Sequence, residues 1–127
     1  MQNNRPLMTV TLMGGDMQAQ GIAQVLINVL DLGANLQAAT DMARFRHQQV
    51  PNVLNLEASL FAVLGAKLEA MGHTVRSVNG GDLGGYQAIM FTPDPNAPAA
   101  SGNAPQPIKG FYRGGSDHRK DGQAVGF

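Results

Sequence analysis

The sequence has 127 residues, a formal net charge of zero and charged side chains at only 14% of its positions. This length is enough for one domain with an enclosed hydrophobic core, and the balanced charge excludes an electrostatic attraction to nucleic acid or to an anionic membrane. Cysteine is absent, which excludes disulfides, thiolate metal sites and a cysteine nucleophile.

Membrane spans and targeting signals are not predicted either. No apolar run approaches the ~20 residues that a membrane-spanning helix needs, and residues 1–10 lack the charged-then-apolar order of a signal peptide. We therefore expect one soluble domain over residues 1–127 with no nucleic-acid or membrane partner, while its compartment, cytoplasmic or periplasmic, is left open.

The chain begins with a predicted strand and a predicted helix. Residues 6–13 (PLMTVTLM) are apolar, rich in β-branched residues and followed by two glycines, which is typical of a strand entering a turn. From Met17 the apolar residues recur at helical spacing as far as a stop at Gly33, with Asp16 as the expected N-cap.

A second helix is predicted over residues 36–48, with Asn35 as its N-cap. Its end carries Arg44, Arg46 and His47. These side chains could bind a carboxylate, but cations at a helix C-terminus often cap carbonyls or pair with nearby acids. We therefore favour a structural role for this cluster.

The middle of the chain predicts strand, helix and strand. Residues 53–56 indicate a brief strand, Ser59 is the expected cap of a helix that ends at Gly72, and residues 73–78 return to strand.

The last third predicts two strands separated by an aperiodic loop. We expect a flexible glycine-rich connection at 80–85, a buried strand over 86–91, a flexible loop over 93–107, a last strand over 108–113 and a tail over 114–127.

This order of elements predicts a mixed α+β fold in which helices cover a sheet. The first strand has no obvious strand partner before residue 53. We therefore expect the sheet to be completed by another chain or by sequence outside this one, and an exposed edge would favour a homo-oligomer or aggregation.

The glycine pair Gly14–Gly15 is the most informative local feature, because it lies between a predicted strand and a predicted helix N-terminus. Backbone N–H groups there lack intrahelical partners, the helix dipole adds positive potential, and glycine lets a ligand approach the backbone. Such a site can hold an oxyanion during acyl transfer. From the pattern alone, a plain glycine turn is the commoner interpretation.

Other candidate catalytic groups are poorly arranged. Ser116, Asp117 and His118 are adjacent in sequence, whereas a hydrolytic triad is assembled from separate segments, so we interpret them as a polar turn. The three histidines lack metal-ligand spacing, so no metal is predicted. No threonine begins the chain, where an α-amino group could serve as its base.

Several of these segments, in this order, resemble the C-terminal portion of gamma-glutamyltransferases, members of the N-terminal nucleophile hydrolase superfamily. The matching segments are MGGDMQAQG (13–21), QVLINVLDLGANLQAATDMARFRHQ (24–48), LEAMGHTV (68–75), GGYQAIMF (84–91) and GGSDHRKDGQAVGF (114–127). Together they are distributed along nearly the whole chain, from residue 13 to residue 127. The sequence Gly-Gly-Asp-Met-Gln at 14–18 resembles a branch of this family whose substrate range is uncertain.

The resemblance implies part of an αββα layered fold, the C-terminal half of the small subunit, with helices packed on antiparallel sheet. It also implies a mechanism in which an N-terminal threonine takes a gamma-glutamyl group from a glutathione-type donor and passes it to water or an amino acid. That threonine lies outside this chain.

The resemblance carries over to this chain at the glycine pair only. Gly14 and Gly15 match the family's oxyanion-binding glycines, whereas the family's donor-binding residues are absent, so no catalytic residue, cofactor or metal is assigned to this chain. Compared with the family, the stretch from Arg5 to Gly14 is short and residues 94–107 replace a tight turn.

The partners that the resemblance implies are the upstream large-subunit and N-terminal small-subunit segments and a gamma-glutamyl substrate. The alternative is a non-catalytic truncated remnant that forms a self-associating α+β module.

Overall fold

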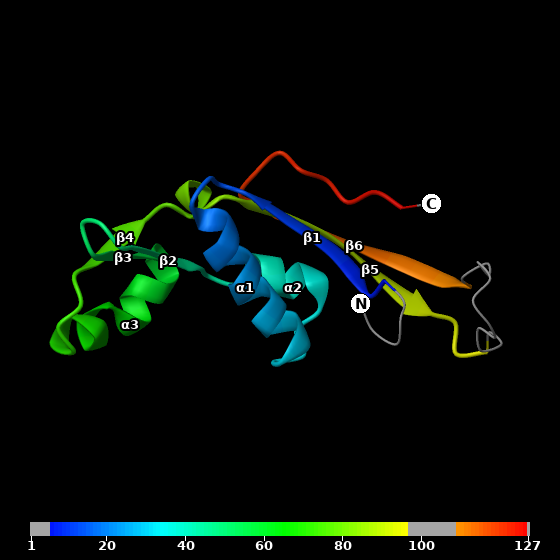
Figure 1. The fold of residues 1–127 in the computed structure, drawn as a ribbon, viewed down its shortest axis with the longest axis horizontal. Coiled ribbons are helices and arrows are strands. Elements are labelled where there is room, and N and C mark those ends of the chain that lie inside the picture. The colour runs from blue at the N-terminus through cyan, green and yellow to red at the C-terminus, as the bar shows by residue number, and fades with distance from the viewer. Residues whose placement is uncertain (1–5, 97–108, 127) are drawn as a thin grey trace.

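The computed structural model describes residues 6–96 and 109–126, which form two three-stranded sheets and their helices (Figure 1). The first sheet has the order β1-β5-β6, with strands β1 (Met8–Met13), β5 (Gly85–Pro93) and β6 (Gly110–Ser116) all antiparallel. The second has the order β2-β3-β4, with β2 (Phe45–Gln48), β3 (Val53–Glu57) and β4 (Val75–Val78). The mixed α+β class is confirmed, although the strands form two sheets.

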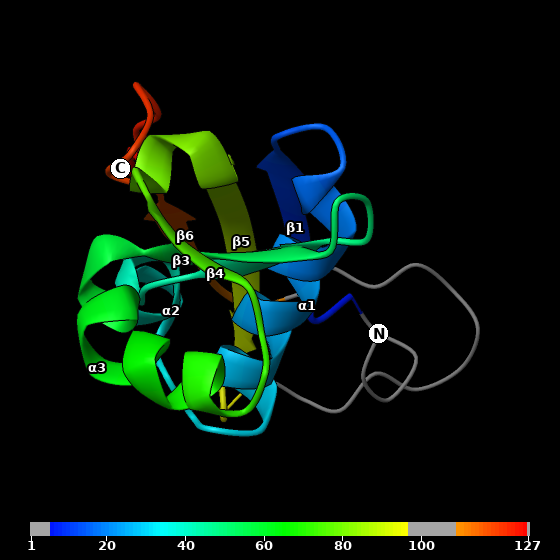
Figure 2. The same cartoon turned by 90° about the vertical axis from the view of Figure 1, so that its left-hand side faces the viewer.

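The helices cover one face of each sheet. Helices α1 (Met17–Leu30) and α2 (Leu36–Asp41) lie side by side against the first sheet, and the C-terminal tail runs along its opposite face (Figure 1). Helix α3 (Ala58–Ala70) connects β3 to the parallel strand β4 and packs on both (Figure 2). A short 3₁₀ helix, η1 (Gly80–Leu83), precedes β5.

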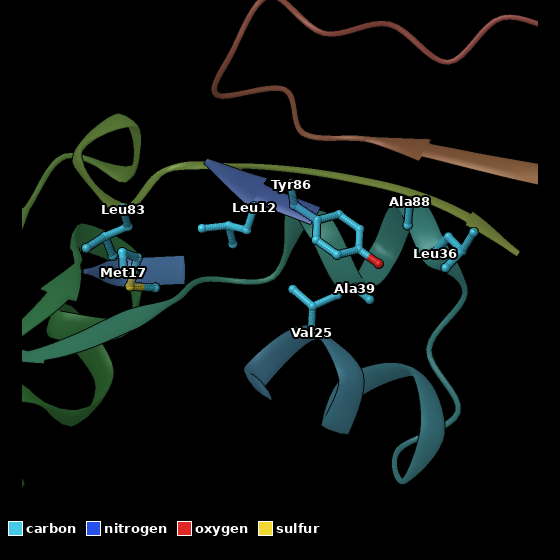
Figure 3. Packing of buried hydrophobic residues seen from close by; sticks show 8 residues of the cluster. All are labelled: Leu12, Met17, Val25, Leu36, Ala39, Leu83, Tyr86 and Ala88. Atoms are coloured by element: carbon cyan, nitrogen blue, oxygen red, sulfur yellow. The ribbon is translucent and has the colours of Figure 1, made fainter. Parts of the chain in front are cut away.

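The hydrophobic core lies between the first sheet and its two helices (Figure 3). Alternate residues of β1 and β5 face it, so Leu12 and Tyr86, which are opposite each other in the register, are both buried. Its members are Leu12, Met17, Val25, Leu36, Ala39, Leu83, Tyr86 and Ala88. The apolar residues at the C-terminal ends of α1 and α3 do not join this core. Leu30 of α1 is 55% exposed, and Met71, just beyond α3, is 74% exposed.

The first strand finds its partner within the chain, which corrects the expectation that it lacks one. Strand β1 pairs with β5 over residues 8–13 and 85–90, a pairing that the sequence hides because about 70 residues separate the two strands. Likewise, the last strand begins and ends later than predicted, at Gly110 and Ser116, because its glycines pair with β5.

The second helix is shorter than predicted. It ends at Asp41, and residues 45–48 form β2, which pairs antiparallel with β3. Arg44, Arg46 and His47 are therefore not at a helix C-terminus. Non-local strand pairing overrides the local helical pattern here.

Two glutamines of α1 close the outer edge of β2. The side-chain amide of Gln24 donates to the carbonyl of Phe45 (2.8 Å) and accepts from its N–H (3.0 Å). Gln20 makes the same pair of bonds with His47, both at 2.8 Å. Four residues of helix rise ~6.0 Å, close to the ~6.6 Å of two strand residues, so the two amides match the strand's backbone spacing.

Three smaller expectations also change. Helix α3 begins at Ala58 with Glu57 as its N-cap, so Ser59 lies inside the first turn and does not cap it. The expected flexible connection at 80–85 is the 3₁₀ helix η1, capped by the Asn79 side chain, which accepts from the N–H of Gly81 at 2.8 Å. Of the predicted loop 93–107, Pro93 ends β5 and residues 97–107 lie outside the described residues.

Candidate functional site

The glycine pair lies where the sequence predicts, between the end of β1 and the start of α1. Both residues have positive φ, +140° at Gly14 and +56° at Gly15, which favours glycine. Their carbonyls point into the helix, where they accept the N–H groups of Met17 (3.1 Å) and Gln18 (3.0 Å). Asp16 occupies the N-cap position, but its side chain makes no capping hydrogen bond.

The glycine pair lies on the surface of the protein. Gly14 and Gly15 are both exposed, and within residues 6–96 and 109–126 neither N–H donates to a protein acceptor. Two neighbouring free donors at the N-terminus of a 14-residue helix form a surface that suits a negatively charged oxygen.

The first turn of the helix is fixed against the core. Met17 is fully buried, and Gly21 lies so close to β1 that an added Cβ would be 2.6 Å from Leu12 Cδ1. Helix α1 therefore packs directly on β1, which fixes the start of the helix beside the end of the strand.

A buried quartet of charged side chains lies next to this region. Arg44, Glu57, Asp117 and Arg119 have side chains that are at most 9% exposed, and their formal charges cancel. Asp117 lies 3.0 Å from Arg44 and 3.1 Å from Arg119, and Glu57 lies 2.7 Å from Arg119. Arg44 Nε and Glu57 Oε1 are 3.5 Å apart without a hydrogen bond between them.

The quartet ties together segments that are distant in sequence. Arg44 precedes β2, Glu57 ends β3, and Asp117 and Arg119 follow β6. Arg119 also donates to the carbonyls of Thr40 (2.8 Å) and Met42 (3.2 Å). These hydrogen bonds cap the C-terminal end of α2. The four charges therefore join the two sheets and the end of α2.

Burial sets the direction of the arginine pKa shifts. Burial lowers the pKa of the Arg44 guanidinium, against the attraction of the Asp117 and Glu57 carboxylates. Burial also acts to lower the pKa of Arg119, but its hydrogen bonds to Glu57 and Asp117 outweigh burial and raise it. Both side chains are cations held in place by buried carboxylates.

Ser116, Asp117 and His118 point to separate partners, so they form no triad. The Ser116 hydroxyl accepts from the Gln87 side chain (2.8 Å), while His118 Nδ1 lies 3.0 Å from Asp41 Oδ1. Burial acts to raise the pKa of Asp41, but hydrogen bonds, first that of His118, lower it overall. Asp117 is fully buried in the quartet.

Arg44 has the structural role that its cluster was expected to have, although through burial and not through a helix end. Arg46, which is partly buried, lies 3.4 Å from the exposed Asp16, and His47 Nε2 lies 2.8 Å from the Asn52 side-chain oxygen. In the sequence, the signal for the quartet was the charge at Arg44 and Glu57 beside apolar neighbours in a chain with few charges.

Within residues 6–96 and 109–126 no metal centre is found, and the glycine pair does not line either of the two surface cavities. No group of three or more His, Asp or Glu side chains within residues 6–96 and 109–126 could hold a metal ion. One surface cavity lies between Glu57, Asn79, Gly80 and Arg119, and a second lies on the outer face of the first sheet; Gly14 and Gly15 line neither. Over the same residues, none of the helices has both the length and the apolar character needed to cross a bilayer.

The chain is similar in sequence and in fold to known proteins and solved structures. The model of the gamma-glutamyltranspeptidase family matches residues 1–127. The glutathione hydrolase proenzyme of Escherichia coli is 33% identical over 81 residues, which are 64% of this chain and 14% of that protein.

Solved structures with a similar fold include a gamma-glutamyltranspeptidase and an acylase. A gamma-glutamyltranspeptidase mutant from Helicobacter pylori has a TM-score of 0.77 at 25% identity, over 94% of this chain and 57% of that chain. A cephalosporin acylase from Bacillus halodurans has a TM-score of 0.75 at 31% identity, over 95% of this chain and 20% of that one. This chain thus spans only part of each relative. Because the family model matches its whole length, the chain belongs to the gamma-glutamyltranspeptidase family.

Proposed function

We propose that this chain supplies the C-terminal part of an enzyme that transfers or hydrolyses gamma-glutamyl groups, and that Gly14 and Gly15 form its oxyanion hole. The observation that carries the proposal is a pair of exposed glycines before α1 whose N–H groups have no protein acceptor within residues 6–96 and 109–126. Family membership supports the chemistry, and the names of the relatives, gamma-glutamyltranspeptidase and glutathione hydrolase, give the substrate class.

The chemistry is acyl transfer. A threonine hydroxyl from a segment outside this chain attacks the carbonyl carbon of the gamma-glutamyl amide, and its proton passes to the α-amino group of that threonine. The carbonyl oxygen becomes an anion as the tetrahedral intermediate forms. Two preorganised N–H donors would stabilise this charge more than they stabilise the neutral substrate, which lowers the barrier.

The intermediate then collapses. The carbon–nitrogen bond of the amide breaks, the leaving amine takes the proton, and an ester between the threonine and the gamma-glutamyl group remains. Water or the amino group of an amino acid attacks this ester and gives a proton to the threonine α-amino group, and the same two donors hold the oxyanion a second time. The ester carbon–oxygen bond then breaks, and the threonine oxygen takes the proton. The glycine pair therefore acts in both halves of the reaction.

The open surface around the pair supports a role for partner segments. The two described cavities do not reach Gly14 or Gly15, so the walls of a substrate pocket would come from the upstream large-subunit and small-subunit segments. We accordingly expect the chain to be inactive alone.

The first test measures 4-nitroaniline release from gamma-glutamyl-4-nitroanilide. It compares the purified chain, the polypeptide encoded upstream, and a mixture of the two. Activity in the mixture but not in the chain alone supports the proposal. Inactivity of a complex whose formation has been demonstrated contradicts it and favours the non-catalytic module.

The second test substitutes the glycine pair in the active complex. Gly15→Val should lower kcat about 100-fold or more while KM changes less than about 3-fold, since the donor acts in the transition state. Valine is strongly disfavoured at the φ of +56°, so the substitution should displace the Gly15 N–H, although an added Cβ itself would meet nothing within 4 Å.

Gly33→Val is the matched control for this substitution. Gly33 also has a left-handed φ, +71°, with nothing within 4 Å of an added Cβ, and it lies beyond the other end of α1. It should keep the kcat of the unsubstituted complex. Equal changes in kcat and KM for Gly15→Val would argue against an oxyanion role.

A further inference from the structure

Gly84 packs directly against the glycine pair from a distant part of the sequence. It is buried, immediately precedes β5, and has φ +83°. A Cβ added at Gly14 would lie 3.0 Å from Gly84 Cα. The two backbones therefore touch without side chains between them.

Only glycine fits at this contact. A Cβ added at Gly84 would overlap the carbonyl oxygen of Met13 and lie 2.9 Å from Leu12 Cδ2. Met13 is the residue before Gly14, and it pairs with Gly85 at the last position of the β1–β5 register. The absence of a side chain at Gly84 thus permits the close approach that fixes where β1 ends.

The charged quartet holds Gly84 in place. Nη2 of Arg44 donates to the carbonyl of Gly84 at 3.0 Å and lies 3.0 Å from Asp117 Oδ2. The same carboxylate oxygen accepts the N–H of Tyr86 at 3.2 Å. Arg44 and Asp117, with side chains 1% and 0% exposed, therefore clamp the backbone on both sides of Gly85.

These contacts form a continuous connection from the buried charges to the N–H of Gly14. The side chains of Arg44 and Asp117 fix the backbone of residues 84–86, and the backbone of Gly84 packs against that of Gly14. An oxyanion hole needs donors within a few tenths of an ångström of their productive positions, so the residue supporting a donor affects catalysis.

We propose that Gly84 is a positioning residue for the oxyanion-binding glycines, and that Arg44 acts through its carbonyl. The inference rests on the proposed function of Gly14 and Gly15. It assigns a role in the reaction to a glycine that touches no substrate, and it makes the quartet a part of the site's geometry.

The first experiment reads the position of Gly14 without any activity. Glycine-selective ¹⁵N labelling of the 127-residue chain labels its 16 glycines. Gly84→Ala should shift the amide signals of Gly14 and Gly15, whereas Gly72→Ala should leave both in place. Gly72 is a matched control, because it also has positive φ (+92°) and nothing lies within 4 Å of its added Cβ.

The second experiment measures kinetics in the active complex. Gly84→Ala should lower kcat about 30-fold or more while KM changes less than about 3-fold. Arg44→Lys keeps a cation beside Asp117 but removes the planar guanidinium whose Nη2 reaches both Asp117 and Gly84, so it should shift the same amide signals and lower kcat about 10-fold. It serves as the decisive variant if Gly84→Ala does not fold.

The outcomes separate this inference from the function on which it rests. If Gly15→Val leaves kcat unchanged, the oxyanion role itself fails. If Gly15→Val lowers kcat but folded Gly84→Ala, or Arg44→Lys in its place, leaves kcat and the Gly14 amide unchanged, only the positioning role is overturned. A parallel rise of KM with the fall of kcat would also overturn it, because misplaced substrate binding would then explain the loss.

Discussion

Asp117→Asn tests how much the buried charges contribute to folding. Each carboxylate oxygen of Asp117 is approached by two donors: Oδ1 by the N–H (3.0 Å) and guanidinium (3.1 Å) of Arg119, and Oδ2 by Arg44 (3.0 Å) and the N–H of Tyr86 (3.2 Å). Asparagine has nearly the same shape, but it removes the charge and points an NH₂ group at one of these donor pairs.

The expected cost is large relative to the stability of a domain. Removing one partner from a buried ion pair costs about 3–5 kcal/mol, because it leaves an uncompensated buried charge. The whole domain is expected to be stable by only about 5–15 kcal/mol. The melting temperature should therefore fall by about 10–20 °C.

Urea denaturation followed by far-UV circular dichroism gives the free energy of unfolding directly. Asp16→Asn is the matched control: Asp16 also pairs with an arginine, Arg46, at 3.4 Å, but its side chain is 93% exposed. The control should change the free energy by less than about 0.5 kcal/mol. A cost below about 1 kcal/mol for Asp117→Asn would refute the reasoning and show that water screens the quartet.

Two further predictions concern the core and the edge of β2. Tyr86→Phe should be neutral or stabilising, because the buried hydroxyl has no hydrogen-bond partner among the described residues. Burial raises the pKa of Tyr86 to about 12. In the unsubstituted chain, ionisation of this phenol should not affect the free energy of unfolding below about pH 10. Towards pH 12 the free energy of unfolding should fall by on the order of 2 kcal/mol, because the phenol ionises at a lower pH in the unfolded chain than in the folded one. Urea titrations at pH 9 and 11.5 should show this fall diminished in Tyr86→Phe, and an equal fall in both proteins would contradict the assignment. Gln24→Ala should cost about 1–2 kcal/mol through its two lost bonds to Phe45, while Gln18→Ala, at an exposed position of the same helix, should cost almost nothing in the same assay; similar costs for the two would count against the edge bonds.

Local patterns sufficed for the elements whose signal is local. The strand ending at Met13 and the helix beginning at Met17 are close to their predicted bounds, because alternation, a glycine turn and helical spacing lie within one stretch of sequence. The position of the glycine pair followed from the same signal.

Features fixed by distant contacts could not be predicted in this way. Residues 45–48 continue a helical pattern, yet their backbone is paired by β3 on one side and by two glutamines of α1 on the other. The quartet joins Arg44 to Arg119, which are 75 positions apart in the sequence. Gly84 must be a glycine only because its backbone packs against the residues around Gly14. Such relations depend on how the two sheets are placed.

The glutamines that close β2 also decide where another chain could join. A strand of a sheet's edge normally offers its N–H and C=O groups to any extended segment, but those of Phe45 and His47 are already bonded to Gln24 and Gln20. Strand addition to the second sheet is thereby directed to β4, at the opposite end of its order. The same helix that follows the glycine pair thus protects β2 against mispairing, and strand exchange at β2 would first have to pull that helix away.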